Sequence, residues 1–141
     1  MAVILYIEDE ITYRTCMSGE LEKAGHSVIM ADNGADAAKM IETWKSTLPD
    51  LIITDHKMPG MSGYELVKIL RGRPAFKDIP IIVLSAVIGQ VKSLEQEQKV
   101  TVIDKLMRIP DILAAINKIA ESVPKKAEAP PPPLEIKRNF Y

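Results

Sequence analysis

Short apolar runs in this chain end at residues with reactive side chains. Glu8 and Asp9 follow VILYI, Asp55 follows LIIT, Ser85 follows IPIIVL, and Lys105 comes just after TVI. Carboxylates bind hard divalent cations, while a hydroxyl and an ammonium suit a phosphoryl group. If these side chains meet at one place, an aspartate among them can attack phosphorus and form an aspartyl phosphate.

Each of these residues also has a purely structural explanation when it is taken alone. Glu8, Asp9 and Glu10 could serve the start of a helix, where the dipole favours acids. Asp55 could be a turn residue, and Ser85 a loop hydroxyl. What favours a shared site is that all of them stand at the ends of apolar runs.

The apolar runs predict the strands that would position these side chains. Strands are expected over residues 3–7, 27–31, 51–54, 79–84 and 101–103. Amphipathic stretches separate them, and strands that alternate with helices predict a doubly wound α/β domain with a five-stranded parallel sheet. The carboxyl ends of parallel strands share one edge, where sites form.

Helical spacing is clear in four of the intervening stretches and weak in one. The spaced apolar residues are Tyr13, Met17, Leu21 and Ala24, then Ala37, Ile41 and Trp44, then Leu66, Ile69 and Leu70, and finally Ile112, Leu113, Ile116 and Ile119. Between residues 86 and 100, Gly89 interrupts the pattern and EQEQK is polar all round. We predict a helix there that has few apolar anchors and rearranges at low cost.

Three carboxylates at one edge would repel one another unless a cation neutralises them. Mg²⁺ prefers oxygen ligands, and the residues therefore predict a magnesium site formed by Glu8, Asp9 and Asp55. Lys105 and Ser85 would contact a phosphoryl group, because its transfer depends mainly on positioning and charge neutralisation. We expect Lys105 to be exposed and to contribute little to stability.

Composition limits the remaining possibilities. The 141 residues carry 18 Lys and Arg against 19 Asp and Glu, a net charge of −1 that gives no sign of nucleic-acid binding. Cys16 is the single cysteine and no apolar run approaches the length of a membrane span, so we expect a cytoplasmic protein. The expected domain spans residues 1–123, and residues 124–141 form a Pro-rich segment, either a disordered tail or linker or a docking tail.

Four segments resemble, in order and spacing, the receiver domain of bacterial two-component response regulators. They are ILYIEDE, DLIITDHKMPGMSGYEL, PIIVLSA and VIDK, and the resemblance covers roughly residues 2–122. It implies a flavodoxin-like fold with strand order 2-1-3-4-5. It also implies phosphorylation by a histidine kinase or a phosphotransfer protein, with no catalysis beyond the chain's own phosphorylation and dephosphorylation.

The resemblance assigns roles at the metal site. Asp55 would be the phosphoacceptor and a metal ligand, and Asp9 would bind Mg²⁺ directly. Glu8 would act through water, and the backbone carbonyl of Lys57 would complete the protein's share of the metal shell.

The resemblance also assigns roles around the phosphoryl group. Ser85 would bind it when the domain switches, with the small Ala86 next to it, and Lys105 would pair with its oxygens. A downstream protein would bind through residues 87–112.

The sequence departs from the family pattern at two positions. Lys105 is followed by Leu106 where proline is usual, so a trans bond is expected, because a non-proline cis bond costs about 2.5–4 kcal/mol. Val102 stands where the family commonly has an aromatic switch residue. We therefore expect phosphorylation to act by reordering residues 87–100.

Two other functions compete with a phosphorylated receiver. A receiver-like adaptor would bind its partner without phosphorylation, which Val102 and Leu106 leave open. A haloacid-dehalogenase-type phosphatase also uses an aspartate nucleophile, but that family has a second aspartate two residues later, where this chain has Lys57.

Overall fold

The computed structural model describes residues 1–123, and the predicted tail at 124–141 lies outside the described residues. A five-stranded parallel sheet has the order β2-β1-β3-β4-β5, which confirms the predicted fold class and strand order. The strands are β1 (Val3–Ile7), β2 (Ser27–Ala31), β3 (Leu51–Asp55), β4 (Ile81–Ser85) and β5 (Thr101–Asp104).

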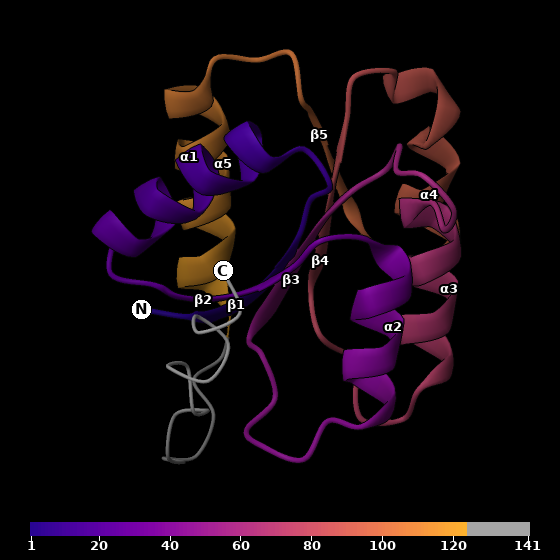
Figure 1. The fold of residues 1–141 in the computed structure, drawn as a ribbon. Coiled ribbons are helices and arrows are strands. Elements are labelled where there is room, and N and C mark those ends of the chain that lie inside the picture. The colour runs from indigo at the N-terminus through magenta and orange to yellow at the C-terminus, as the bar shows by residue number, and fades with distance from the viewer. Residues whose placement is uncertain (124–141) are drawn as a thin grey trace.

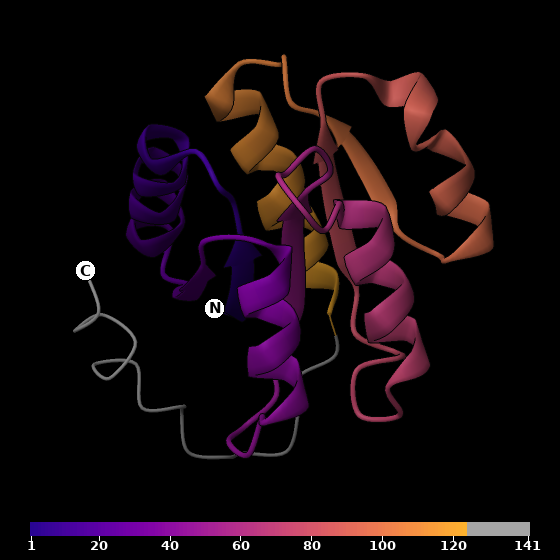
Figure 2. The ribbon, with the colours of Figure 1, turned by 45° about the vertical axis from the view of Figure 1, so that its right-hand side comes forward.

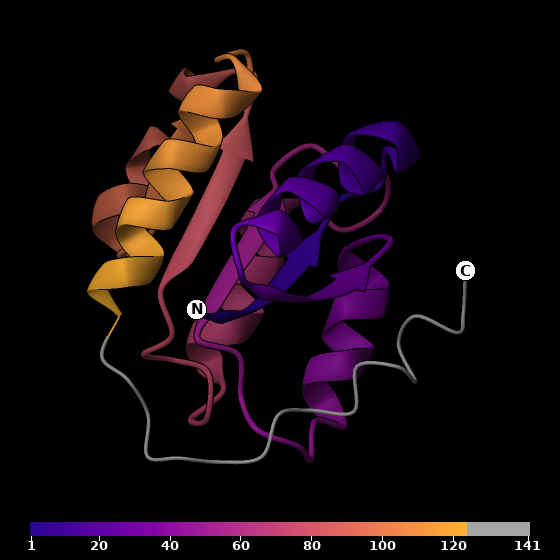
Figure 3. The same ribbon diagram turned by 90° about the vertical axis from the view of Figure 1, so that its left-hand side faces the viewer.

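Helices cover both faces of the sheet (Figure 1). On one face lie α1 (Ile11–Lys23) and α5 (Ile109–Ser122), which Figure 3 shows in front of the strands. On the other face lie α2 (Gly34–Glu42), α3 (Gly63–Gly72) and α4 (Lys92–Glu97), with α2 and α3 side by side in Figure 2. None of the helices within residues 1–123 is long and apolar enough to cross a membrane.

Alternation along the strands builds two separate cores. In β1, Ile4 and Tyr6 pack toward α1 and α5, whereas Leu5 and Ile7 pack toward α2 and α3. Successive side chains of a strand point to opposite faces, and all four of these are fully buried. Near-continuous apolar strands are therefore required, as the sequence indicated.

The strand register brings the reactive ends together. Ile7 pairs with Thr54, so Glu8 and Asp55, the residues that follow them, lie at the same level at the ends of β1 and β3. Asp55 pairs with Leu84, and Ser85 pairs with Asp104, the residue before Lys105. All the candidate side chains consequently lie along one edge.

The segment between β4 and β5 differs most from expectation. The predicted helix over 86–100 is a 3₁₀ turn at Ile88–Gln90 followed by the six-residue α4, so the prediction was too long. Val91 and Leu94 are its buried apolar anchors. With so little apolar surface to bury, the segment cannot sustain a longer helix.

Smaller differences occur at element ends. β3 and β5 extend one residue further than predicted, and β4 begins and ends later. Ala24 caps α1, and Trp44 lies beyond the end of α2, where its ring contacts Phe76 edge-on. These shifts leave the reactive residues at the predicted edge.

Candidate functional site

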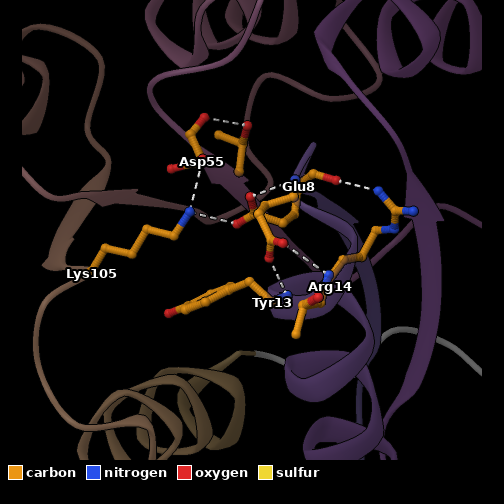
Figure 4. Close-up of polar contacts among 8 residues, drawn as sticks. Glu8, Tyr13, Arg14, Asp55 and Lys105 are labelled. Atoms are coloured by element: carbon orange, nitrogen blue, oxygen red, sulfur yellow. Dashed lines mark hydrogen bonds and ion pairs between the residues drawn. The ribbon is translucent and has the colours of Figure 1, made fainter.

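Lys105 links two carboxylates at the edge of the sheet (Figure 4). Its Nζ donates hydrogen bonds to Oε1 of Glu8 at 2.8 Å and to Oδ2 of Asp55 at 2.9 Å. The side chain of Lys105 is 18% exposed, so the expectation of an exposed lysine was wrong. The ends of the strands place the ammonium between two buried acids, Glu8 and Asp55, and the two hydrogen bonds hold it there.

The peptide bond between Lys105 and Leu106 is trans, as expected. The backbone of Lys105 is held because its N–H donates to Ser85 O at 2.9 Å. The next turn is closed by Asp104, whose side chain accepts from the Leu106 N–H at 2.8 Å. The lysine therefore reaches both acids without a proline after it.

Three carboxylates form a compact cluster. One oxygen each from Glu8, Asp9 and Asp55 lies within 4.8 Å of the others. Glu8 has no exposed surface and Asp55 is 5% exposed, while Asp9 is the most accessible of the three. These hard oxygen donors fit a cation such as Mg²⁺.

Burial dominates the electrostatics of the cluster. It raises the pKa of Glu8 to about 7; the charge of Asp55 acts in the same direction, and the hydrogen bond from Lys105 opposes both. Burial alone would lower the pKa of Lys105, but its hydrogen bonds to Glu8 and Asp55 outweigh this and hold the pKa above its ordinary value. Lys105 is therefore a charged counter-ion of the two acids.

The acidic triplet divides between two tasks. Glu10 is the N-cap of α1, and its carboxylate accepts hydrogen bonds from the N–H groups of Thr12 and Tyr13. Glu8 and Asp9 instead face the carboxylate cluster. The structural explanation is thus right for Glu10, whereas Glu8 and Asp9 belong to the carboxylate cluster.

Two residues of α1 support the site and were missed in the sequence, where Tyr13 was assigned only to a helical stripe. Arg14 is buried, and its Nη1 donates to the carbonyl of Glu8 at 2.7 Å, while Nη2 lies 3.5 Å from Asp32. The ring of Tyr13 lies beneath Lys105, with its centroid 4.5 Å from Nζ. The signal available in the sequence was a cation at helical spacing from Met17 and Leu21, on the apolar face of α1.

The loop after β3 brings the start of α3 against Asp55. The N–H of Gly63 donates to His56 O at 2.7 Å, and a Cβ at Gly63 would lie 2.5 Å from Asp55 O. Gly60 turns the chain with a φ of +78°, which suits glycine. Lys57, whose backbone carbonyl is a predicted ligand, lies in this loop with an exposed side chain.

Ser85 and Ala86 lie at the same edge but do not contact the acids. The Ser85 hydroxyl donates to Val87 O at 3.0 Å and accepts from Val87 N at 3.1 Å. Ser85 is buried, whereas Ala86 is exposed. The hydroxyl is therefore bound to the backbone that leads into the 3₁₀ turn.

This arrangement of residues matches a known family. The model of the response regulator receiver domain matches residues 4–117. The chain belongs to this family. Its place among receiver domains agrees with the fold and with the resemblance carried by the sequence motifs.

Individual relatives support the same conclusion. The chain is 31% identical over 139 residues to the alkaline phosphatase synthesis transcriptional regulatory protein PhoP of Bacillus subtilis, covering 96% of this chain and 54% of that protein. The receiver chain spans about half the length of the curated relatives it matches first.

Solved receiver domains have the same fold. The receiver domain of a signal transduction histidine kinase from Syntrophus aciditrophicus is 28% identical, with a TM-score of 0.76 over 94% of this chain and 99% of that one. The response regulator TrrA of Thermotoga maritima, solved in complex with Mg²⁺-BeF, is 28% identical, with a TM-score of 0.70 over 84% of this chain and 99% of that one.

Proposed function

We propose that this receiver accepts a phosphoryl group on Asp55 in a Mg²⁺-dependent reaction, from a histidine kinase or a phosphotransfer protein. The observation that carries the proposal is the Lys105 ammonium bound to both Glu8 and Asp55 beside Asp9. A nucleophile, a mobile cation and a set of metal-binding oxygens meet at one point. Phosphoryl transfer requires this combination of positioning and charge neutralisation.

The carboxylate cluster fits the metal. In the proposed site Asp9 and Asp55 would bind Mg²⁺ directly, Glu8 would act through water, and the carbonyl of Lys57 would complete the protein's share of the ligands. An indirect role suits Glu8, because both of its carboxylate oxygens are engaged, Oε1 by Lys105 and Oε2 by the backbone N–H of Glu10. When bound, the ion would offset the negative charge that the carboxylates and a phosphoryl group bring together.

The chemical step is a displacement at phosphorus. A carboxylate oxygen of Asp55 forms a bond to phosphorus as the bond between phosphorus and the donor's leaving group breaks, and the leaving group keeps the electron pair. Lys105, already 2.9 Å from Asp55 Oδ2, can pair with the phosphoryl oxygens without a large movement. The chain acts on itself in this reaction and turns over no separate substrate.

The proposed output begins at Ser85. To donate to a phosphoryl oxygen, the hydroxyl must give up its hydrogen bond to Val87 O, but it can still accept from the Val87 N–H, so the backbone after β4 follows it. The short α4 offers little resistance, since few apolar side chains anchor it. A downstream protein then binds across residues 87–112, next to the edge strand β5.

The adaptor alternative is the weaker one. Val102 and Leu106 depart from the family pattern, but neither prevents Lys105 from reaching Glu8 and Asp55. An adaptor that binds without phosphorylation has no need of this assembled cluster. We place the receiver in the cytoplasm, where its phosphodonor would supply the phosphoryl group.

Treatment with acetyl phosphate tests the proposal. We expect a Mg²⁺-dependent mobility shift on a gel that separates phosphorylated protein, and no shift for Asp55→Asn. A shift of Asp55→Asn equal to that of the wild type would show that the phosphoacceptor is another residue.

A further inference from the structure

The ammonium of Lys105 has a third contact besides its two carboxylates. Its Nζ lies 4.5 Å from the centroid of the Tyr13 ring, which belongs to the first turn of α1. Figure 4 shows the ring beside the end of the lysine side chain. A ring face attracts a cation at this distance, most strongly where water is partly excluded, as it is around this half-buried pair.

The three contacts differ in what happens when the site is used. Asp55 acquires the phosphoryl group, and Glu8 and Asp55 both serve the metal in the proposed function. Either event would weaken the hold of Asp55 on Lys105, because Asp55 would then share its oxygens with the ion or with the phosphoryl group. The Tyr13 ring is neutral and is not a ligand of Mg²⁺ or a phosphoryl acceptor in the proposed function. Its attraction for the ammonium would therefore persist.

Two hydrogen bonds hold the turn of α1 that carries the ring. The backbone N–H of Tyr13 donates to the Glu10 carboxylate, which caps α1. The next residue, Arg14, ties the same turn to the carbonyl of Glu8 at 2.7 Å. The backbone that carries the ring is therefore fixed next to the lysine side chain.

We propose that Tyr13 is a positioning residue, whose ring keeps the Lys105 ammonium beside Asp55 when the carboxylates are engaged by Mg²⁺ or by the phosphoryl group. This inference rests on the proposed function for its kinetic consequence and on the geometry alone for the placement of Lys105. In this chain Leu106 replaces the usual proline, and the ring provides a restraint on the side chain itself.

The hydroxyl of Tyr13 has no part in the proposed positioning of Lys105. Among residues 1–123 it has no hydrogen-bond partner, although it is buried. Removing a buried, unpaired hydroxyl does not weaken the fold. Tyr13→Phe should therefore keep the function, whereas Tyr13→Leu, which loses the ring, should not.

The kinetic test is a double-mutant cycle with phosphoramidate as the donor and intact mass as the readout. Tyr13→Leu should slow phosphorylation at saturating donor roughly 3- to 10-fold, while Tyr13→Phe stays within about twofold of the wild type. In a Lys105→Met background, Tyr13→Leu should have no further effect, because it acts through the lysine. Equal slowing in both backgrounds, or slowing by Tyr13→Phe as large as by Tyr13→Leu, would overturn the inference.

Tyr64 supplies a matched control. Its ring, at the start of α3, lies 4.8 Å from Nζ of Lys68 on the same helix and packs against the core on the opposite face of the sheet from Tyr13. Tyr64→Leu removes a similar ring–ammonium contact and should leave the rate unchanged. A loss of rate equal to that of Tyr13→Leu would mean that loss of any such ring has this effect, and would count against the inference.

A second measurement tests, without phosphorylation, whether the Lys105 side chain lies against the Tyr13 ring. Ring currents should shift the ε-methylene protons of Lys105 upfield in NMR spectra of the wild type and Tyr13→Phe, with and without Mg²⁺, but not in those of Tyr13→Leu. Unshifted protons in the Mg²⁺-bound wild type would overturn the inference. Labelling of Asp55→Asn at the wild-type rate would instead overturn the proposed function, and this NMR result would still decide the role of Tyr13.

Discussion

Nζ of Lys105 lies 2.8 Å from Oε1 of Glu8, a carboxylate with no exposed surface. The sequence interpretation treated Lys105 as an exposed lysine whose loss would not affect stability. The contact reverses that expectation, because removal of the ammonium leaves a buried acid without its cation.

Lys105→Met should therefore lower the free energy of unfolding by about 1–3 kcal/mol in Mg²⁺-free buffer, the usual cost of an unpaired buried polar group. Thermal or urea denaturation measures this. Added Mg²⁺ should stabilise the variant at least as much as the wild type, because the ion supplies the missing positive charge. Lys39→Met, at an exposed position of α2, is the control and should unfold like the wild type. Identical unfolding of Lys105→Met and the wild type without Mg²⁺ would mean that the Lys105–Glu8 pair contributes nothing to the free energy of unfolding.

Metal binding should depend on Asp9 more than on the adjacent Glu10. Asp9→Asn removes a proposed direct ligand and should weaken Mg²⁺ binding roughly tenfold or more, as measured by calorimetric titration. Glu10→Gln removes the same charge close by, but Glu10 caps α1 and does not belong to the carboxylate cluster. It should change the affinity far less. Similar affinities for the two variants would indicate that only net charge matters.

The close approach of α3 to Asp55 makes Gly63 sensitive to substitution. In Gly63→Ala the new Cβ would lie 2.5 Å from Asp55 O and 2.8 Å from His56 Cα, so the backbone must move. We expect a loss of about 1–3 kcal/mol in urea denaturation, together with slower phosphorylation. Gly19→Ala is the control: it meets no atom within 4 Å inside α1 and should stabilise by up to about 1 kcal/mol. A neutral Gly63→Ala would show that the loop adjusts freely.

Much of this arrangement could be predicted because it depends on short-range patterns. Buried parallel strands require apolar runs, and the residues after those runs in β1, β3 and β5 do lie along one edge. The order of the strands came from the resemblance to receiver domains, since periodicity contains no information on which strands are neighbours.

What could not be predicted depends on contacts between distant elements. Lys105 pairs with Glu8 across 97 positions of the chain, and only the fold reveals that this lysine is covered. Arg71, at the end of α3, likewise donates to the carbonyls of Ile79, Gln98 and Lys99, contacts that the helical spacing does not indicate. The length of α4 was overestimated, because Val91 and Leu94 alone among the described side chains anchor residues 86–97 in the fold.

We expect Ser85 to transmit the effect of the phosphoryl group to residues 86–97. In amide hydrogen exchange with Mg²⁺ and beryllofluoride, a mimic of the phosphoryl group, we expect protection to change in residues 86–97. Ser85→Ala should still bind beryllofluoride but lose this change, because the hydroxyl that accepts a hydrogen bond from the Val87 N–H is gone. Ser122→Ala, which lacks an exposed hydroxyl at the far end of α5, should respond like the wild type. Changes confined to residues 8, 9 and 55–58 in the wild type would exclude this segment as the switch and favour the adaptor alternative.

Chemical trapping of the acyl phosphate tests the central claim most directly. After incubation with acetyl phosphate and Mg²⁺, borohydride reduction converts a phosphorylated aspartate to homoserine, which peptide mass spectrometry locates in the chain. The account predicts homoserine at position 55, and none there when EDTA replaces Mg²⁺. Homoserine at Asp9, or equal labelling of Asp55 with EDTA, would contradict it.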